Sequence, residues 1–174
     1  MNTMTGTNYF ELFGLAPRFT IDMTSLEQAF HRLQTELHPD RHASHTEAER
    51  RVALQLSTTV NDGYRTLRHP ASRAQFLLSL SGKDDANAAV TPAFLMSQME
   101  WREAIAEACA SRDIAALEAL AKRLKHKVAV HEKNLAATLD ELGDFSIAAQ
   151  QVNELRFYEK LRSEIDDAQD RIEH

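Results

Sequence analysis

The tripeptide His38, Pro39 and Asp40 places an imidazole and a carboxylate on either side of a proline, whose ring restricts the backbone. Pro39 disfavours the α conformation at His38 and cannot continue a helix, so a turn begins here. The Asp40 carboxylate can accept hydrogen bonds from backbone or cationic donors. Arg32 and Arg41 flank it on either side in the sequence. We therefore expect a loop that presents the His38 imidazole and the Asp40 carboxylate to a binding partner, flanked by Arg32 and Arg41.

A divalent metal site is the chemical alternative for the same loop, because imidazole and carboxylate are both metal ligands. The potential ligands are His38, Asp40, His42 and His45. The loop offers no second carboxylate of fixed geometry, and His126 and His131 are spaced by five residues rather than four. We expect no metal and no cofactor. The histidines outside the loop are interpreted as solvated surface residues, namely His31, His69, His126 and His131.

Composition favours an all-helical protein and argues against several kinds of chemistry. The chain has 174 residues, of which 43% are hydrophobic, with only 5 glycines and 4 prolines. The glycines do not cluster, so no glycine-rich loop could hold a nucleotide, and we expect no enzymatic activity. The net charge of -6 gives no encouragement to nucleic-acid binding.

The single cysteine, Cys109, excludes an internal disulfide and any metal site built from several thiolates of one chain. It falls on an apolar helical stripe, so we interpret it as a small buried hydrophobic residue. The first eight residues are polar, and no apolar run approaches the ~18 residues of a membrane span. We expect a cytoplasmic protein without membrane contact.

Helical periodicity dominates the first half of the chain. A short aromatic helix over residues 9–15 is closed by a glycine. Thr24 and Glu27 are interpreted as a capping box that opens a helix reaching residue 37. A second long helix, 46–68, carries an apolar stripe, and 72–80 forms a short one. The two long helices should form an antiparallel hairpin with the tripeptide loop at its tip. The stripe of the second helix comprises Val52, Leu56, Val60, Tyr64 and Leu67.

A polar segment rich in small residues separates the two halves. Residues 82–92 run from Gly82 to Pro92 and are the expected linker between domains 1–81 and 93–174. Three helical patterns follow at about 93–111, 113–142 and 145–172, which predicts an antiparallel three-helix bundle. The middle pattern carries Leu117, Leu120, Leu124, Val128, Leu135, Leu139 and Leu142, and Gly143 ends it.

The helix after Pro92 has more apolar residues than one stripe can bury. At about 100° per residue, Phe94, Trp101 and Ile105 form a core stripe with Ala108 and Cys109. A second group points elsewhere, and we call it the outward patch: Leu95, Met96, Met99, Glu100 and Glu103. It has two interpretations. It could be a second buried contact within the bundle, or a partner-binding patch of adaptable apolar side chains rimmed by carboxylates.

The sequence resembles a J-domain, the module that docks on Hsp70 chaperones and stimulates their ATPase. The resemblance rests on the short aromatic helix, the tripeptide and the segment Asn61-Asp62-Gly63-Tyr64-Arg65-Thr66-Leu67 in the returning helix. With Leu67-Arg68-His69-Pro70 and the segments 94–103 and 155–162 included, the sequence resembles more specifically the HscB-type co-chaperones of iron–sulfur cluster assembly. It extends over nearly the whole chain. Eukaryotic relatives carry an N-terminal cysteine-pair metal module, which is missing here and implies a bacterial type.

This resemblance implies a function and two binding sites. The J-domain would bind an HscA-type Hsp70 through His38, Pro39 and Asp40 with Arg32 and Arg41, and would stimulate its ATPase. The bundle would bind an IscU-type scaffold protein. Its binding residues, matched by position, would be Leu95, Met96, Met99, Glu100, Glu103 and Phe157. Phe157 could also be absorbed into the core.

Two other functions remain compatible with the sequence. A generic J-domain co-chaperone with a different client would share the tripeptide, and the outward patch argues against it without naming a client. A helical metal-dependent enzyme would use the loop histidines. Arg32 is accompanied by Glu27 and Glu36, so electrostatic steering toward an acidic Hsp70 surface should be modest.

Overall fold

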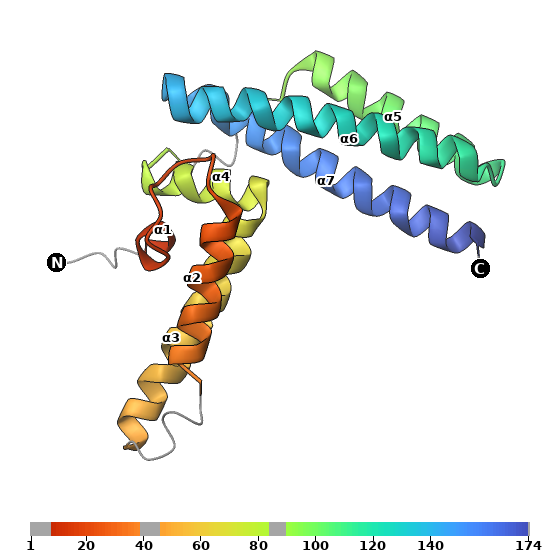
Figure 1. Cartoon of the computed structure of the whole chain (residues 1–174). Helices are drawn as coiled ribbons and strands as arrows, with labels where there is room; N and C mark the ends of the chain where they lie inside the picture. The colour runs from red at the N-terminus through yellow and green to blue at the C-terminus, as the bar shows by residue number, and fades with distance from the viewer. Residues whose placement is uncertain (1–7, 39–45, 84–89, 174) are drawn as a thin grey trace. The chain divides into compact units, whose positions relative to one another are not determined.

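The computed structural model describes residues 8–38, 46–83 and 90–173, and all the elements within these ranges are helical. The chain divides into two compact units, residues 1–82 and residues 83–174. The expected all-α architecture, a helical hairpin followed by a three-helix bundle, is confirmed (Figure 1).

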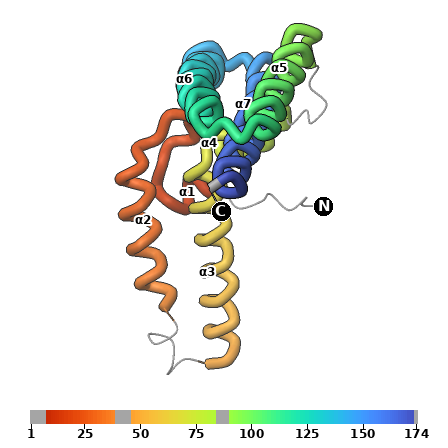
Figure 2. Tube along the Cα trace, turned by 90° about the vertical axis from the view of Figure 1, so that its right-hand side faces the viewer, coloured from red at the N-terminus to blue at the C-terminus, as the bar shows by residue number. Residues whose placement is uncertain are grey.

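The first unit is built on an antiparallel pair of helices, α2 (Met23–Glu36) and α3 (Glu47–Arg68). They run side by side in both views (Figures 1 and 2). The short helix α1 (Tyr9–Leu12) packs on α3, and α4 (Pro70–Leu80) follows α3 directly. Pro70 occupies the first position of α4, where a backbone N–H would have no acceptor within the helix, so its absence does not weaken the helix. The core between these helices includes Phe10, Phe13, Leu26, Val60, Leu67 and Leu78.

Helix α2 begins two residues earlier than the expected capping box implies. Its N-cap is Asp22, whose carboxylate accepts hydrogen bonds from the Thr24 backbone N–H at 3.0 Å and the Ser25 hydroxyl at 2.6 Å. The interpretation of Thr24 and Glu27 as a capping box was therefore wrong. Asp22, two residues upstream, caps the helix instead by accepting a hydrogen bond from a backbone N–H group of the first turn. A full capping box occurs at Thr46, the N-cap of α3.

The apolar stripe expected on α3 is only partly correct. Val60 and Leu67 are buried, but Val52 is 56% exposed and Leu56 is 45% exposed. The buried face of α3 runs through Ala53, Val60 and Leu67, which recur every seven residues. At about 100° per residue, Val52 lies about 100° and Leu56 about 60° from Ala53 around the helix. Both side chains therefore lie at the edge of the buried face rather than on it.

Gly63 allows the aromatic residues of α1 to contact the backbone of α3. A Cβ atom at this position would lie 2.9 Å from Tyr9 Cδ1 and 3.1 Å from Phe13 Cε2. We expect Gly63→Val to destabilise the first unit by about 2 kcal/mol, because the inserted side chain forces these rings apart. Urea unfolding would measure the loss. Asp62→Val, at an exposed position of the same helix, should change stability by less than about 0.5 kcal/mol; an equal effect of both variants would contradict the packing explanation.

The second unit is a bundle of α5 (Pro92–Ala110), α6 (Ile114–Ala136) and α7 (Phe145–Glu173). The three helices lie along one another (Figures 1 and 2). Helix α6 continues into a π-helical segment, η2 (Ala137–Leu142), which Gly143 ends in the left-handed conformation at φ 65°. Leu142 was expected on the core stripe but is 75% exposed, since the wider π-helical turn changes the angular spacing of the residues beyond Ala136.

The bundle core is aromatic at one end and aliphatic along its length. It includes Phe94, Trp101, Leu117, Leu124, Tyr158 and Leu161, all less than 9% exposed. Cys109 was expected to be buried; it is partly buried and packs against this core.

His131 was expected at the surface, but it is 8% exposed. Its Nε2 lies 2.7 Å from the backbone carbonyl oxygen of Gln151, and since a carbonyl only accepts, Nε2 carries the proton. Nδ1 lies 3.6 Å from the Glu154 carboxylate. The prediction was wrong because His131 stands seven residues after Leu124 and four before Leu135, on the core stripe, where this hydrogen bond makes burial of an imidazole possible.

Tyr158 makes the bundle sensitive to alkaline pH. Burial, with a smaller contribution from the nearby Glu154 charge, raises the pKa of Tyr158 from 10.0 to about 12. Above pH 10 the unfolded tyrosine loses its proton while the folded one keeps it, so the folded state binds more protons and its stability falls as the pH rises toward 12.

We expect this effect to cost about 1 to 2 kcal/mol of unfolding free energy by pH 12, once solvent screening is allowed for. Urea unfolding of the wild type and of Tyr158→Phe at a series of pH values between 9 and 12 would measure it. The phenylalanine variant should lose less stability over this range. A parallel decline in both proteins would show that Tyr158 is not the titrating group.

Candidate protein-binding surfaces

The outward patch is formed by one face of α5. Thr91 caps the helix by accepting a hydrogen bond from the Phe94 backbone N–H, and Pro92 occupies its first turn. Phe94, Trp101 and Ile105 of the core stripe face the bundle interior, where each is less than 9% exposed. The opposite face carries apolar side chains that are largely exposed: Leu95 at 49%, Met99 at 63% and Met96 at 65%.

These exposures decide between the two interpretations of the patch. A second contact within the bundle would bury Leu95 and Met99, whereas the structure leaves them 49% and 63% exposed. The interpretation as a second core contact is therefore wrong. Glu100 and Glu103 are also exposed and border the apolar residues. An exposed apolar centre with a charged rim is the arrangement found in protein interfaces.

Phe157 packs against the core and also contacts an exposed side chain of α5. It is partly buried, and its ring meets the Phe94 ring edge-on with centroids 5.4 Å apart. The guanidinium carbon of the exposed Arg102, on α5, lies 5.8 Å from the centroid of the Phe157 ring. The sequence did not indicate Arg102, because a contact between a cation on one helix and a ring on another depends on tertiary structure.

The side chains expected to contact Hsp70 are described only in part. Arg32 is exposed on α2, and His38, just beyond the end of that helix, is exposed too. Pro39, Asp40 and Arg41 lie outside the described residues, as do His42 and His45. Residues 8–38, 46–83 and 90–173 contain no group of three or more possible metal ligands. The role of the tripeptide stays a prediction.

None of the helices in the described part of the chain has the length and apolar character needed to cross a bilayer. Exposed apolar side chains occur in both units. The first unit exposes Val52, Leu54, Leu56 and Leu80. The second exposes Val130, Leu142 and Ile147 in addition to the outward patch.

A helical hairpin preceded by a short aromatic helix, followed along the chain by a three-helix bundle with an exposed apolar patch, defines a J-domain co-chaperone. Residues 90–166 match a family model described as the HSCB C-terminal oligomerisation domain. A co-chaperone protein HscB homolog from Azoarcus is 50% identical over 171 residues, which cover 96% of each chain. The chain belongs to the HscB family of co-chaperones, which the sequence resemblance associates with iron–sulfur cluster assembly.

Two solved structures share the fold. The chaperone HscB from Vibrio cholerae is 36% identical with a TM-score of 0.85, covering 95% of this chain and 99% of the other. The human co-chaperone protein HscB is 28% identical with a TM-score of 0.86, covering 94% of this chain and 83% of the other. The relatives are named as chaperones or co-chaperones rather than as enzymes.

Proposed function

We propose that this protein recruits an IscU-type scaffold protein to an HscA-type Hsp70 in the cytoplasm and stimulates the ATPase of that Hsp70. The observation that carries the proposal is the outward patch. Its three apolar side chains are 49% to 65% exposed although they lie on a helix whose other face is core. Exposed methionines adapt to a partner surface at low cost, and carboxylates at the rim favour one orientation.

The other half of the proposed function belongs to the first unit. The tripeptide His38, Pro39 and Asp40, with Arg32 and Arg41, would contact the Hsp70 in its ATP-bound state. Contacts made better with one conformation shift the population toward it, so docking alone can promote hydrolysis. The chain then acts as an adaptor that brings the scaffold to the Hsp70. No bond to phosphate is broken by its own residues.

The assay that tests this function is steady-state ATP hydrolysis by an HscA-type Hsp70. The rate would be measured for the Hsp70 alone, with this protein, and with this protein plus an IscU-type scaffold. We expect the rate to rise at the second step and again at the third. If the protein leaves the rate unchanged, the Hsp70 assignment fails. If the scaffold adds nothing, and direct calorimetry detects no binding to it, the client is a different protein.

A further inference from the structure

The middle of α6 carries a dense group of basic side chains that the proposed function does not use. Residues 122–127 hold four of the 12 Lys and Arg of the second unit and no acidic residue. The basic side chains of this segment are all exposed, and we call them the basic face: Lys122, Arg123, Lys125, His126 and Lys127. None of them belongs to the outward patch or lies near the tripeptide in the sequence, so neither proposed site accounts for this concentration of positive charge.

The basic face covers the solvent side of nearly two helical turns. Leu124 is 1% exposed and packs in the bundle core. At about 100° per residue, Lys122 and His126 are about 160° from Leu124, on the opposite side of the helix. By the same geometry, Arg123 and Lys127 share one flank. This flank is the one toward α5, because the Arg123 guanidinium carbon lies 4.1 Å from the centroid of the tryptophan ring of α5.

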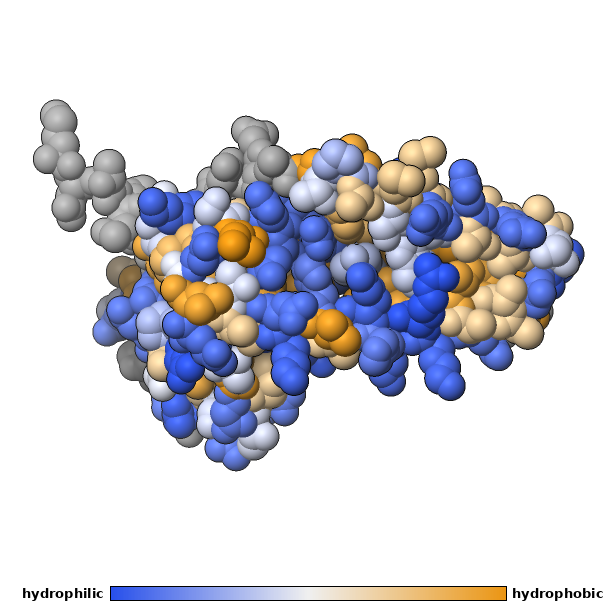
Figure 3. Space-filling view, turned by 90° about the horizontal axis from the view of Figure 1, so that it is seen from above, coloured by the Kyte–Doolittle hydropathy of each residue, from blue (hydrophilic) through white to orange (hydrophobic). Residues whose placement is uncertain are grey.

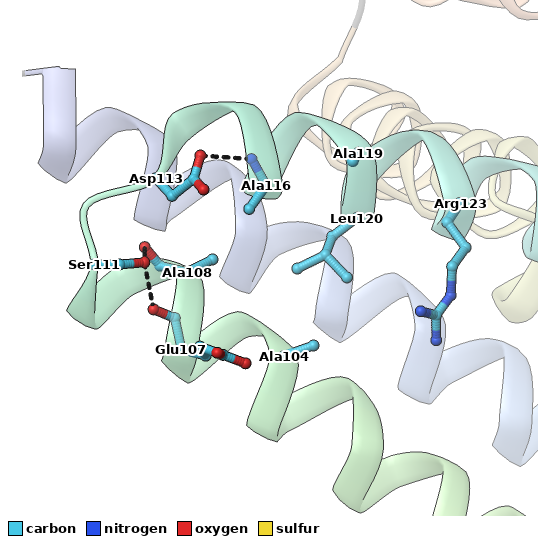
Figure 4. Close-up of a pocket in the computed structure, with 9 residues that line it drawn as sticks. All are labelled: Ala104, Glu107, Ala108, Ser111, Asp113, Ala116, Ala119, Leu120 and Arg123. Atoms are coloured by element: carbon cyan, nitrogen blue, oxygen red, sulfur yellow. Dashed lines mark hydrogen bonds between the residues drawn. The ribbon is translucent and has the colours of Figure 1, made fainter.

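An apolar groove between α5 and α6 borders the basic face. Its volume is about 390 Å³, and its floor is lined by small or aliphatic side chains, including Ala104, Ala108, Ala116 and Leu120 (Figure 4). Arg123 lines the same groove (Figure 4). Seen from above, pale orange hydrophobic side chains gather toward the end of the bundle where α5 and α6 are joined, beside hydrophilic ones (Figure 3). A partner that binds here can therefore contact cations and apolar surface at the same time.

The surroundings of the basic face limit what can bind to it. Residues 83–174 outside α6 hold 7 Lys and Arg against 16 Asp and Glu, so the rest of the second unit is acidic. Residues 122–127 span only about 8 Å along the helix axis. A nucleic-acid duplex, with one negative charge per ~1.7 Å, or a flat anionic membrane would extend beyond this length onto acidic surface. Helix α6 also has no Phe, Tyr or Trp that could stack on bases or insert into lipid.

We propose that the basic face and the groove together bind an acidic amphipathic helix of another protein. Such a helix has carboxylates every three or four residues along one side and aliphatic side chains on the adjacent side. Its aliphatic side enters the groove, while its carboxylates lie over Lys122, Arg123 and Lys127, which is a helix-in-groove arrangement. Glu107 lines the groove from α5 and repels a helix with carboxylates on both sides of its aliphatic row. Charge complementarity thus selects both the partner and its orientation.

A synthetic helix tests this proposal directly. The probe is a fluorescein-labelled peptide of about 20 residues, long enough to form a helix, made of Glu, Ala and Leu with its carboxylates along one side. Fluorescence anisotropy with the full chain should give a dissociation constant of about 10 to 100 µM in low salt, because the interface is small. Raising the salt from about 0.05 to 0.5 M should weaken binding by about tenfold or more. The absence of binding at about 500 µM protein would overturn the proposal.

Further probes separate charge, pattern and class of partner. A peptide with Lys in place of every Glu should bind about tenfold more weakly or less, as should one whose carboxylates are spread around the helix. A double-stranded oligonucleotide and vesicles of phosphatidylcholine and phosphatidylglycerol should not displace the acidic probe. Displacement by either of them as effective as that by unlabelled peptide would overturn the assignment of a protein partner. These measurements need neither Hsp70 nor scaffold, so their failure would leave the proposed function unaffected.

Charge reversal on α6 locates the site. Lys122→Glu/Lys127→Glu should weaken binding of the acidic probe by about tenfold or more and strengthen binding of the Lys peptide. Arg123 is left unchanged because it stacks on the tryptophan ring of α5. The matched control Lys160→Glu/Arg162→Glu makes the same change in net charge at exposed positions of α7 and should bind like the wild type. Circular dichroism should show unchanged helicity in both variants. An equal loss of binding in the control would overturn the proposal.

Ala119→Gln tests the groove separately from the charges. Ala119 is exposed and lines the groove, so a longer neutral side chain there obstructs the groove without disturbing the core. This variant should weaken binding of the acidic probe roughly fivefold. The control Ala129→Gln places the same side chain at an exposed position of α6 that does not line the groove, and it should keep wild-type affinity. Equal affinities of the two variants would overturn the placement of the helix in the groove.

Discussion

Asp40→Asn is expected to return the ATPase rate of the Hsp70 to its basal value. The substitution keeps the size of the side chain but removes its charge, so any charge-assisted hydrogen bond to a cation or backbone donor of the partner is weakened. Losing one member of a charged pair in an interface typically costs 2 to 5 kcal/mol, a decrease in affinity of at least about 30-fold. Steady-state ATP hydrolysis over a range of co-chaperone concentrations would measure it.

The matched control for this variant is Asp62→Asn. Asp62 is an exposed carboxylate on α3 of the same unit, and its neutralisation makes the same change in net charge. The control should stimulate the Hsp70 as the wild type does, and both variants should keep wild-type unfolding midpoints. Full stimulation by Asp40→Asn would contradict the assignment of the tripeptide, and the loop would then be tested for metal binding by calorimetry.

Leu95→Ala/Met99→Ala is expected to abolish the additional stimulation by the scaffold while keeping the stimulation by the co-chaperone alone. Truncating a central anchor of an interface commonly costs more than ~1 kcal/mol, and two anchors together should weaken scaffold binding by about 30- to 100-fold. Both side chains are about half exposed or more, so the bundle loses little packing. Calorimetric titration with the scaffold would give the affinity directly.

A control for this double variant is available within the same unit. Val130 is 46% exposed and Leu142 is 75% exposed, so Val130→Ala/Leu142→Ala removes a similar amount of exposed apolar surface outside the outward patch. The control should bind the scaffold with wild-type affinity. If both double variants bind equally well, the outward patch is not the scaffold site. If both lose binding, exposed apolar surface in general, rather than this patch, carries the affinity.

Helix type, helix order and the direction of the outward patch followed from the sequence because they depend on local periodicity. The angular positions of Leu95, Met96 and Met99 relative to Phe94 are fixed by 100° per residue, whatever the helix packs against. Likewise, Gly143 ends a helix because it can take a left-handed conformation that costs other residues more. Such features need no knowledge of the tertiary structure.

Errors arose where the outcome depended on competing local groups or on the lengths of neighbouring elements. Thr24 and Asp22 can both cap a helix, and only the folded backbone selects one. Val52 and Leu56 have helical spacing with Val60, but the buried face of α3 runs through Ala53 instead. The same spacing that predicts burial of Leu124 and Leu135 applies to His131, whose polarity was given more weight than its position.

The sequence alone determined that this chain is helical and that one helix has an unusually wide apolar face, and it predicted a domain boundary near residue 82. Only the tertiary structure decided which apolar residues remain exposed, that His131 and Tyr158 lie buried beside Glu154, and that Arg102 contacts Phe157. Periodicity fixes the face of a helix on which a residue lies, whereas burial and charge pairing depend on which other helix lies against that face.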